Sequence, residues 1–574
     1  MNFHLALCIM GEMKNQLVFK EKKWREAPEI KDAERLYEIL LENRNLSDPG
    51  KIQSFLSPSL TNLCSPWEMK GMKKAVERIL SAIDLGERIM VFGDFDADGI
   101  TSTTILVSGL QELGAEVSYR IPDRHTESHG LKNSHVDKIK EKEVKLIITC
   151  DCGMNNDEAI LYAKSLGIDT IVTDHHESDP KTFPHKAVAV LNPKQAGCDY
   201  LFKDLAGAGV AFKLISALAE KAFDDPQVMG DYIYRFLEIC AIGLIADCVS
   251  LTGENRILAR FGIEKLKTTK WPGLIEIFKQ TNIDPRNIDA GTISFAIAPR
   301  LNAASRLGEV EVAIKLFLGD QKQHFQLVKR LNELNEERKE LTKKAFTESL
   351  EQFRKEASLQ MCMSKSWDLG ILGLVASQYV AYYNIPSVVA TIRPDGLLSA
   401  SCRAPEGYSM IKALQEISDL FESFGGHDGA AGFLANPANY EKIQAGLDKF
   451  FAKTPLKENE VKLEAFITED LLDFTLIDFL DNLAPFGRGN GEPIFGLKNV
   501  EVLNCQTVGN GQIHLRILGR VGKKEFNFMA FFADDFVDIA KVGSILDILF
   551  TVSGNYWNGD RRLQLRVEDL RKVD

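Results

Sequence analysis

The sequence contains no pair of cysteines spaced as C-x-x-C and no dense group of cysteines. Its ten cysteines are scattered over 574 residues, which excludes a disulfide-stapled scaffold and indicates a reduced, cytoplasmic compartment. Cys150 and Cys152 flank Asp151, and on a strand their side chains would point away from that acid. We therefore predict that both are core thiols rather than metal ligands.

Long apolar runs are also absent. No stretch reaches the roughly 18 residues of a membrane-spanning helix, and the opening segment His4–Met10 lacks the basic start and the length of a signal peptide. Neither a membrane nor export is expected.

The chain has no excess of basic residues either, since its net charge is -12. This argues against a nonspecific nucleic-acid coat protein, but it does not exclude a nuclease whose acids are neutralised by cations.

A chain of this length exceeds a single hydrophobic core, so several domains are expected. Strand-like runs first alternate with amphipathic helices, which is typical of a doubly wound α/β domain with a parallel sheet. A smaller α/β pattern follows, and then short alternating strands that suggest an OB-type β-barrel. The predicted units are an N-terminal helical extension at 1–80, a catalytic α/β domain at 81–318, a connector helix at 319–358, a smaller α/β domain at 359–455 and the barrel at 456–574.

The charged segment from Gln321 to Phe353 has apolar residues at heptad-like spacing. A run of about 33 residues at about 1.5 Å each forms a helix of about 50 Å, which is enough to bridge two domains. Arg338 falls at one of the heptad positions that would have to be apolar in a coiled coil. We therefore favour an interdomain strut over a coiled-coil dimer, and we expect a monomer.

Three aspartates follow the apolar run Ile89–Gly93. Asp94, Asp96 and Asp98 occupy alternate positions directly beyond this run, which has the character of a buried strand. So many carboxylates at a buried position cannot all stay charged unless cations lie between them. The pattern indicates bound metal.

Metal-capable groups end three further apolar runs. Asp151 ends the second, the triplet Asp174-His175-His176 ends the third, and Asp247 ends the fourth. In a parallel open sheet the carboxyl ends of the strands meet at one edge, so acids far apart in the sequence come together in space. Imidazole among carboxylates makes the site softer than an all-oxygen cage, so manganese should serve as well as or better than magnesium.

Other interpretations of these motifs fit less well. A calcium loop starting at Asp94 would need a glutamate at its twelfth position, where the chain has Ile105. A phosphatase of the haloacid dehalogenase type also starts with a strand and two acids, but it has no place for an Asp-His-His triplet. The triplet at Asp174 could instead cap a helix, and Asp247 taken alone is equally well explained as an acid at a helix end.

The acceptors from these four segments suffice for two divalent ions. Two ions a few ångströms apart can activate a water and neutralise both the attacking and the leaving oxygen of a phosphoryl group. A carboxylate shared by both ions would be indispensable, because its removal would disrupt both sites. We nominate Asp98 or Asp151 for this role.

Together these motifs resemble the RecJ family of single-strand-specific DNA exonucleases, within the DHH phosphoesterase superfamily. The matching segments occur in the family order and span almost the whole chain. They are Gly93–Gly99, Asp151–Gly153, Asp174–His176, Leu205–Phe212, Ala246–Asp247, Pro299–Arg306, Gly425–His427 and Pro485–Asn490.

The resemblance implies a DHH domain and a DHHA1 domain that face each other across a narrow cleft, with a C-terminal OB domain. The cleft would exclude duplex and admit single-stranded DNA, which would be degraded 5′→3′ to 5′-mononucleotides in recombination and DNA repair. Asp98, Asp151 and His176 would be the catalytic residues. Two Mn²⁺ or Mg²⁺ ions would be held by Asp94, Asp96, Asp98, Asp151, His175 and Asp247.

The resemblance also implies contacts to substrate and partners. Arg124, Ser401 and Arg403 look like the family's terminal-phosphate binders, a role that suits a guanidinium fork. Arg306 and His427 look like further phosphate contacts, and solvated or structural positions are the alternative for all five residues. A single-stranded-DNA-binding protein and a recombination helicase are the partners that the resemblance suggests.

The chain departs from the family pattern at two places. Asp368 follows Trp367 where the family usually has histidine, and His129 precedes Gly130 where an aromatic residue is usual. Two other hypotheses stay open. One is a phosphodiesterase for short oligonucleotides or cyclic dinucleotides, although such enzymes commonly have only the two central domains. The other is a replication scaffold that keeps the fold but loses its ligands, although every expected ligand is present here.

Overall fold

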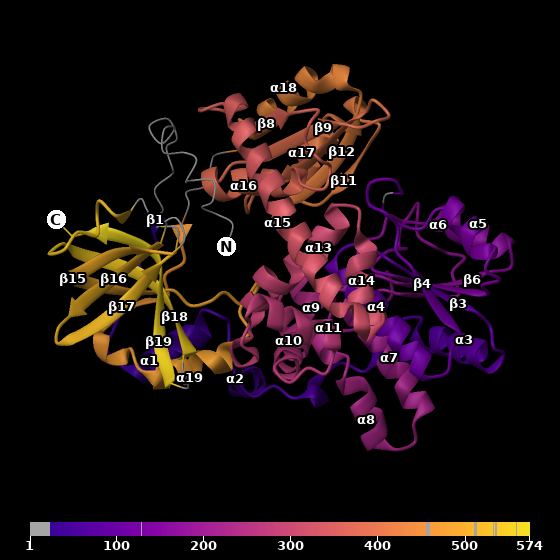
Figure 1. Cartoon of the computed structure of the whole chain (residues 1–574), viewed down its shortest axis with the longest axis horizontal. Coiled ribbons are helices and arrows are strands. Elements are labelled where there is room, and N and C mark those ends of the chain that lie inside the picture. The colour runs from indigo at the N-terminus through magenta and orange to yellow at the C-terminus, as the bar shows by residue number, and fades with distance from the viewer. Residues whose placement is uncertain are drawn as a thin grey trace.

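The architecture is described from a computed structural model of the chain. The structure describes residues 23–573 apart from 128, 455–459, 510–513, 532, 534–535 and 558–559, so the opening segment His4–Met10 lies outside the described part. Figure 1 shows a domain built on a parallel sheet, a smaller domain above it and a β-barrel at the side. Within the described residues, no helix is long and apolar enough to cross a bilayer.

A five-stranded parallel sheet forms the centre of the first domain. Its strand order is β4-β3-β5-β6-β7, and each neighbouring pair is parallel. The order reverses between β3 and β5, which is the switch point where ligands bind in open α/β sheets. The doubly wound α/β class predicted from the sequence is confirmed. The strands are β3 Ile89–Gly93, β4 Val117–Arg120, β5 Leu146–Cys150, β6 Asp169–Thr173 and β7 Ala189–Leu191.

Helices cover both faces of this sheet. Ile89 and Val91 face a core shared with α3, α4 and α7, whereas Met90 and Phe92 face a second core shared with α5 and α6. Successive side chains of a strand point to opposite faces, so a strand covered on both faces is apolar throughout. The helices are α3 Met72–Asp84, α4 Ala97–Glu112, α5 Asn133–Lys140, α6 Asp157–Ser165 and α7 Gly207–Ala222.

A group of helices extends this domain toward the long helix α15, which spans His324–Ser349. As predicted, the long helix joins the two α/β domains, because it packs on α11, α13 and α14 of the first domain and on α16 of the second. Arg338 is only 9% exposed, so this heptad position lies in the interdomain packing. The remaining helices are α8 Pro226–Tyr234, α9 Leu237–Ala246, α10 Gly253–Leu266, α11 Pro272–Thr281, α12 Ala290–Thr292, α13 Ala298–Arg306 and α14 Val310–Leu318.

The smaller domain contains a mixed sheet of order β11-β12-β10-β9-β8. Its β8 and β9 are parallel and the other pairs are antiparallel. One core lies between the sheet and α17 and α18, and a second core joins α16 to the end of α15. The elements are β8 Gln360–Met363, α16 Leu372–Tyr383, β9 Ser387–Ile392, β10 Leu398–Arg403, α17 Met410–Glu416, β11 Ser423–Gly426, β12 Ala430–Ala435 and α18 Tyr440–Phe451.

Five strands close into the predicted barrel at the C-terminal end of the chain. Their order is β16-β17-β19-β18-β15, and β15 pairs with β16 to complete the ring. Closure leaves the ring without an open edge. The elements are β13 Glu460–Val461, β14 Ala465–Ile467, α19 Phe474–Leu483, β15 Phe495–Val508, β16 His514–Val521, β17 Lys524–Ala530, β18 Ile545–Trp557 and β19 Asp560–Lys572.

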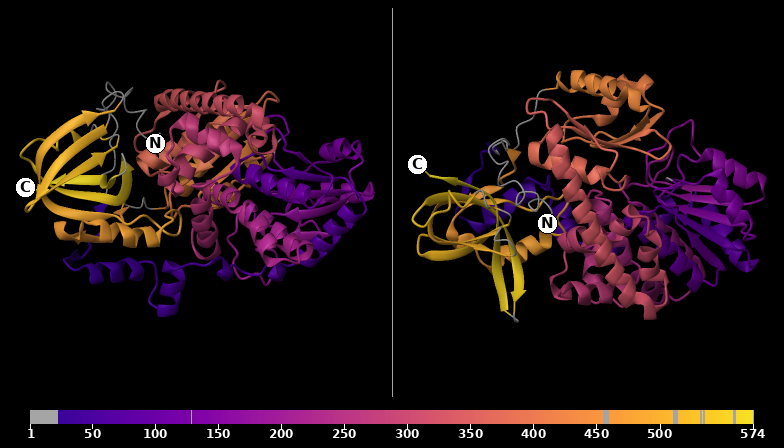
Figure 2. Two further views of the ribbon diagram at one scale, coloured as in Figure 1. Left: turned by 60° about the horizontal axis from the view of Figure 1, so that its bottom comes forward. Right: turned by 45° about the horizontal axis from the view of Figure 1, so that its top comes forward.

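The first described residues pack against this barrel, although the two segments are far apart in the sequence (Figure 2). Strand β1 (Lys23–Trp24) pairs with β13, and β2 (Glu29–Ile30) pairs with β14. Leu36 and Leu40 of α1 (Ala33–Glu42) are buried in the same cluster as the barrel strands. Helix α2 (Pro49–Leu56) then leads the chain toward the first domain.

Two arginines of α10 join the first domain to α19. Arg256 is almost fully buried and donates from Nη2 to the carbonyls of Asn482 and Ala484 at 2.7 and 2.9 Å. Arg260 donates to the carbonyls of the same two residues at 3.2 Å. Carbonyls in the last turn of a helix have no partner within the helix, and cations are favoured there. The end of α19 is therefore capped by side chains from another domain.

The buried Glu238 of α9 predicts a pH-dependent stability. Burial raises the pKa of Glu238 to about 7, and its Oε2 has no hydrogen-bond partner in the described part of the chain. A carboxyl whose pKa is higher in the folded state stabilises the fold at low pH and loses that contribution as the pH rises through about 7. Glu238→Gln should therefore raise the free energy of unfolding by about 3 kcal/mol at pH 8 and by much less at pH 5.

Thermal unfolding at both pH values measures this effect. The exposed Glu264, which pairs with Lys267 on the surface, supplies the control Glu264→Gln. An equal shift for Glu238→Gln at pH 5 and pH 8 would contradict the assignment.

Candidate metal centre

The predicted ligands gather at the carboxyl ends of β3, β5 and β6. Asp94 directly follows β3, Asp151 follows β5, and His175 stands two residues beyond β6. The sequence suggested that all three acids of the first motif follow a strand, but α4 begins at Ala97. Asp96 is the N-cap of this helix, and its Oδ1 accepts the N–H of Asp98 and of Gly99 at 3.0 Å. Acidic side chains are favoured in a first helical turn, which explains the early start.

The six side chains predicted to bind metal and the predicted catalytic His176 are brought together. Atoms that could ligate an ion lie within 4.8 Å of one another in three overlapping groups. Asp151 belongs to two of the groups, which favours it over Asp98 as the shared carboxylate. Asp247 ends helix α9 as its C-cap residue, and it also belongs to a metal-capable group, so its position fits both interpretations of this acid. The groups are Asp151, His175 and His176; Asp98, His175 and Asp247; and Asp94, Asp96 and Asp151.

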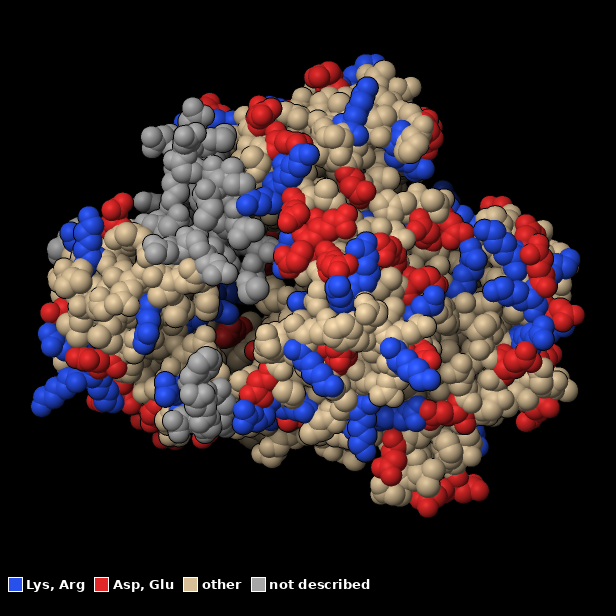
Figure 3. All heavy atoms as spheres, viewed as in Figure 1, with Lys and Arg blue, Asp and Glu red and all other residues tan. Residues whose placement is uncertain are grey.

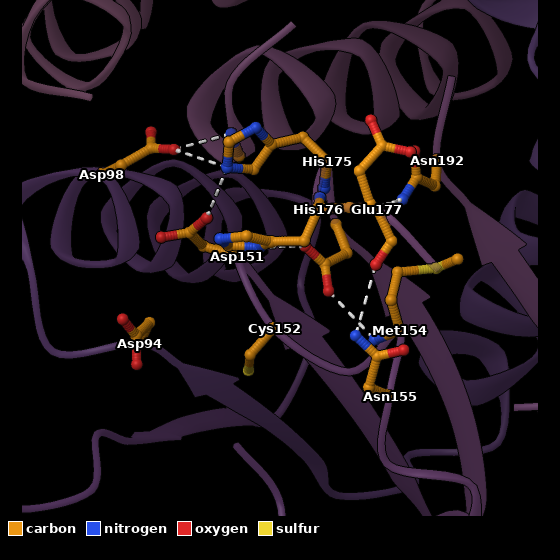
Figure 4. A network of polar contacts seen from close by, with 12 residues as sticks. Asp94, Asp98, Asp151, Cys152, Met154, Asn155, His175, His176, Glu177 and Asn192 are labelled. Carbon is orange, nitrogen blue, oxygen red and sulfur yellow. Dashed lines mark hydrogen bonds and ion pairs between the residues drawn. The ribbon is translucent and has the colours of Figure 1, made fainter. Parts of the chain in front are cut away.

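His175 lies at the centre of this cluster, and Figure 4 shows Asp98 and Asp151 directed at its ring. Its Nε2 is 3.1 Å from Asp151 Oδ1, 3.7 Å from Asp247 Oδ2 and 3.8 Å from Asp98 Oδ2. Among the described residues, neither His175 Nε2 nor Asp151 Oδ1 has a hydrogen-bond partner. Buried polar atoms normally have one. A divalent cation fits this arrangement, because it would satisfy both atoms.

Two positions next to this cluster must be glycine, because a side chain there would collide with the acids. A Cβ on Gly207 would come within 2.8 Å of Asp151 Oδ1, and a Cβ on Gly243 would come within 2.7 Å of Asp98 Oδ1. The backbone N–H of Gly207 donates to Asp98 Oδ2 at 2.7 Å. Close approach of backbone to ligand is the use that glycine serves here. The helices α7 and α9 thus press against the acids without filling the site.

The electrostatics of the cluster favour bound cations. Burial, followed by the charges of Asp247 and Asp96, raises the pKa of Asp98 well above its usual range. Burial and the charge of Asp96 likewise raise the pKa of Asp247 to about 7. Burial lowers the pKa of His175 to about 3, so its ring is neutral and can offer a lone pair. Cations between these carboxylates would relieve their repulsion.

Asp174, which the sequence prediction left out of the metal set, holds the two histidines in place. It accepts the backbone N–H of Met154, His175 and His176 at 2.9, 2.7 and 3.1 Å, and His176 Nδ1 lies 2.8 Å from its Oδ1. Burial opposes protonation of His176, but the hydrogen bond and charge of Asp174 raise the pKa of His176 to about 9. His176 is half-exposed and presents a positive charge beside the cluster.

The residues predicted to bind phosphate form a second group, drawn from both α/β domains. Arg306 Nη1 donates to the carbonyl of Gly370 at 2.7 Å, across the domain boundary. Arg403 Nη1 lies 3.2 Å from Ser401 Oγ, and Arg124 lies over the ring of Phe95. Burial, followed by the charges of Arg124, Arg338 and Arg403, lowers the pKa of Arg306 to about 9.

No carboxylate among the described residues forms an ion pair with Arg124, Arg306 or Arg403. On the face of the molecule shown in Figure 3, acidic and basic side chains lie among one another over most of the surface. His427, at the turn after β11, has a lowered pKa through burial and then through the nearby charges of Arg403 and Arg488. The net negative chain thus contains a local group of unpaired cations beside its acids.

Sequence reasoning did not find several residues that support the site. Asn302 Oδ1 accepts the N–H of Ala97 at the start of α4, and His129 Nδ1 lies 2.9 Å from Asp94 Oδ1. The one sequence signal for Asn302 was its position in the segment Pro299–Arg306, which matches the family pattern. Cys150 and Cys152 are buried and belong to none of the metal-capable groups, as predicted.

A parallel sheet whose strand ends gather carboxylates and imidazoles within 4.8 Å of one another offers the divalent-cation site that metal-dependent phosphoesterases use. Three family models match the chain. They are the DHH family, N-terminal domain over residues 88–244, the DHHA1 domain over 356–453 and the RecJ OB domain over 463–569.

Two curated relatives and one solved structure span most of the chain. The single-stranded-DNA-specific exonuclease RecJ of Bacillus subtilis is 33% identical over 538 residues, which cover 92% of this chain and 67% of that protein. The RecJ of Salmonella typhimurium is 31% identical, with 88% and 91% covered. The crystal structure of RecJ from Thermus thermophilus in complex with Mn²⁺ matches with a TM-score of 0.79 and 30% identity, covering 94% of this chain and 76% of that one.

The chain belongs to the RecJ family. The family predicted from the sequence motifs is thereby confirmed, as are the DHH, DHHA1 and OB domain types. The relative from Thermus thermophilus was solved with Mn²⁺ and also with Mg²⁺, the two ions that the sequence predicted.

Removing one carboxylate should separate metal binding from folding. Asp98→Asn should abolish the stabilisation that Mn²⁺ gives the wild-type protein, which is about 2.7 kcal/mol when the metal is present at about 100 times its Kd. Without metal the variant should differ little in stability from the wild type, because the loss of one buried repelling charge is offset by the amide's inability to accept the N–H groups of both Gly207 and Ala208.

Thermal unfolding with and without Mn²⁺, together with calorimetric titration, measures both effects. Asp84→Asn, at an exposed acid at the end of α3, is the control. Unchanged Mn²⁺ uptake by Asp98→Asn would refute this assignment.

Proposed function

We propose that this protein is a metal-dependent exonuclease that degrades single-stranded DNA 5′→3′ to 5′-mononucleotides, in recombination and DNA repair. One observation carries the proposal: seven metal-capable side chains meet at one edge of the DHH sheet, beside a group of arginines without acidic partners. Curated members of the family are named single-stranded-DNA-specific exonucleases, which supports it.

Two divalent ions would be held at this edge. When bound, Mn²⁺ or Mg²⁺ ions activate a water and neutralise charge on the phosphate. Asp151 would be shared between the ions, because it belongs to two of the three groups. The hydrogen bond from the His175 ring to the backbone of Leu205 orients the imidazole and leaves Nε2 for the metal. The ligands would be Asp94, Asp96, Asp98, Asp151, His175 and Asp247.

His176 would act on the scissile phosphate. Its ring is protonated at neutral pH because its pKa is raised to about 9, and its carboxylate partner Asp174 fixes its orientation. A positioned cation beside the reaction centre stabilises the negative charge that develops on the phosphate oxygens. Asp98 and Asp151 would complete the catalytic set.

Arg124, Arg306, Ser401 and Arg403 would bind the phosphate at the 5′ end, with His427 beside them. Guanidinium groups suit this task, because their planar fork matches phosphate oxygens. Burial, and after it the charge of Arg124, lowers the pKa of Arg306 and of Arg403, so a bound phosphate would relieve the repulsion among these cations. Recognition of a terminal phosphate next to the metal centre would make the enzyme remove nucleotides from that end.

The barrel and the partners belong to the same proposal. OB-type barrels bind unpaired nucleic acid through stacking and positive charge, so the barrel would hold the strand that leads to the cleft. We propose that the enzyme acts in the cytoplasm as a monomer, with a single-stranded-DNA-binding protein and a recombination helicase as partners.

A substrate panel tests the activity. With Mn²⁺, the purified protein should release a 5′ label as a mononucleotide at once and shorten a 3′-labelled strand gradually. A blunt duplex should resist, since a cleft built for one strand does not admit two. Preference for a dinucleotide over a long strand would favour the phosphodiesterase hypothesis instead, and a lack of any metal-stimulated hydrolysis would favour the scaffold.

Terminal-phosphate recognition is tested with Arg403→Met. Loss of a charged hydrogen bond costs about 1.5–3 kcal/mol, so KM for a 5′-phosphorylated strand should rise about 10- to 150-fold. KM for a 5′-hydroxyl strand should change little. Arg393→Met, at a partly exposed arginine that follows β9 and pairs with Asp395, is the control. An equal loss on both substrates would contradict the proposed contact.

A further inference from the structure

His129 stands beside the metal centre without a part in the mechanism described so far. Its Nδ1 lies 2.9 Å from Asp94 Oδ1. Asp94 is 5% exposed and belongs to a metal-capable group with Asp96 and Asp151. His129 itself belongs to none of the three groups found among the described residues. His129 therefore contacts the predicted metal ligand Asp94 and would not bind the ion itself.

The backbone around His129 fixes the position of the ring. Gly130 has a φ of +85°, and a Cβ at this position would come within 2.9 Å of the Asn156 side chain. Asn156 Oδ1 also accepts the N–H of Leu131 at 3.1 Å. The loop is thus held against the start of α6 at the residues that follow His129. Its ring is placed by the fold, although the side chain is half-exposed.

Two aromatic contacts complete the placement. The ring of His129 meets Phe95 edge-on with a centroid distance of 6.2 Å, and it meets His176 edge-on at 5.9 Å. Both neighbours flank the centre, since Phe95 lies between two of the acids in sequence and His176 belongs to a metal-capable group. The ring is enclosed on the side of the cluster and faces solvent on the other.

We infer that His129 is a positioning residue that holds the Asp94 carboxylate toward Asp96 and Asp151. A carboxylate can rotate about its Cβ–Cγ bond, and a donor on one oxygen restricts that rotation. Metal-ligating carboxylates are generally hydrogen-bonded in this way, and loss of such a partner typically costs about 10- to 100-fold in metal affinity or activity. The inference rests on the proposed metal site and adds a residue that tunes it.

Mn²⁺ affinity, measured by calorimetric titration of the full chain, tests the inference. His129→Phe keeps the ring contacts with Phe95 and His176 but removes the donor, so Mn²⁺ should bind about 10- to 100-fold more weakly. His129→Asn should restore affinity close to that of the wild type, because its amide nitrogen is bonded to Cγ as Nδ1 is and can donate from the same place. His129→Leu, a second variant without a donor, should behave like His129→Phe. His185→Phe, at an exposed histidine of another loop, should change nothing.

Kinetics separate this role from a contact with DNA. The activity lost by His129→Phe should return as the Mn²⁺ concentration is raised, while KM for the strand stays constant. A raised KM at saturating Mn²⁺ with unchanged metal affinity would overturn the inference in favour of substrate contact. Equal Mn²⁺ affinity in wild type and His129→Phe would overturn it as well. Failure of the wild type to bind Mn²⁺ would instead overturn the proposed function, so the two failures are distinguishable.

Discussion

Repulsion among buried carboxylates is the constraint on which the rest of this structure depends. Asp98, Asp151 and Asp247 surround one neutral imidazole, and each has a raised pKa because burial and its acidic neighbours oppose ionisation. Such a cluster costs stability unless cations bind within it. The sheet, the close-packed glycines of α7 and α9 and the N-cap of α4 all hold these acids together against that repulsion.

Much of the fold could be predicted because its signals are local. Apolar runs such as Ile89–Gly93 mark strands buried on both faces, and the acids beyond them mark the edge where a parallel sheet binds ligands. The predicted bridging role of the long helix is confirmed, since that helix packs between two domains, whereas the expected monomeric state stays a prediction. The rule that the carboxyl ends of parallel strands meet at one edge predicted that Asp94, Asp151 and His175 lie close together.

The supporting residues could not be predicted from the sequence in the same way. His129 and Asn302 act through contacts with Asp94 and Ala97 that only the folded chain brings about. The sequence likewise did not reveal the role of Asp174, whose oxygens are occupied by backbone N–H groups and His176. Composition and spacing report which groups could bind a metal, whereas the orientation of each group is set by its neighbours.

The capping of α19 by Arg256 and Arg260 bears on how this chain could be dissected or recombined. Both guanidinium groups come from α10, so the last carbonyls of α19 have these donors only while the barrel stays attached to the first domain. A barrel excised as an isolated fragment would leave those carbonyls to water and would also lose the strands β1 and β2 contributed by the opposite end of the chain. The described C-terminal elements therefore depend on contacts with the first domain and with β1 and β2, so we expect the barrel to be less stable when it is excised from the chain.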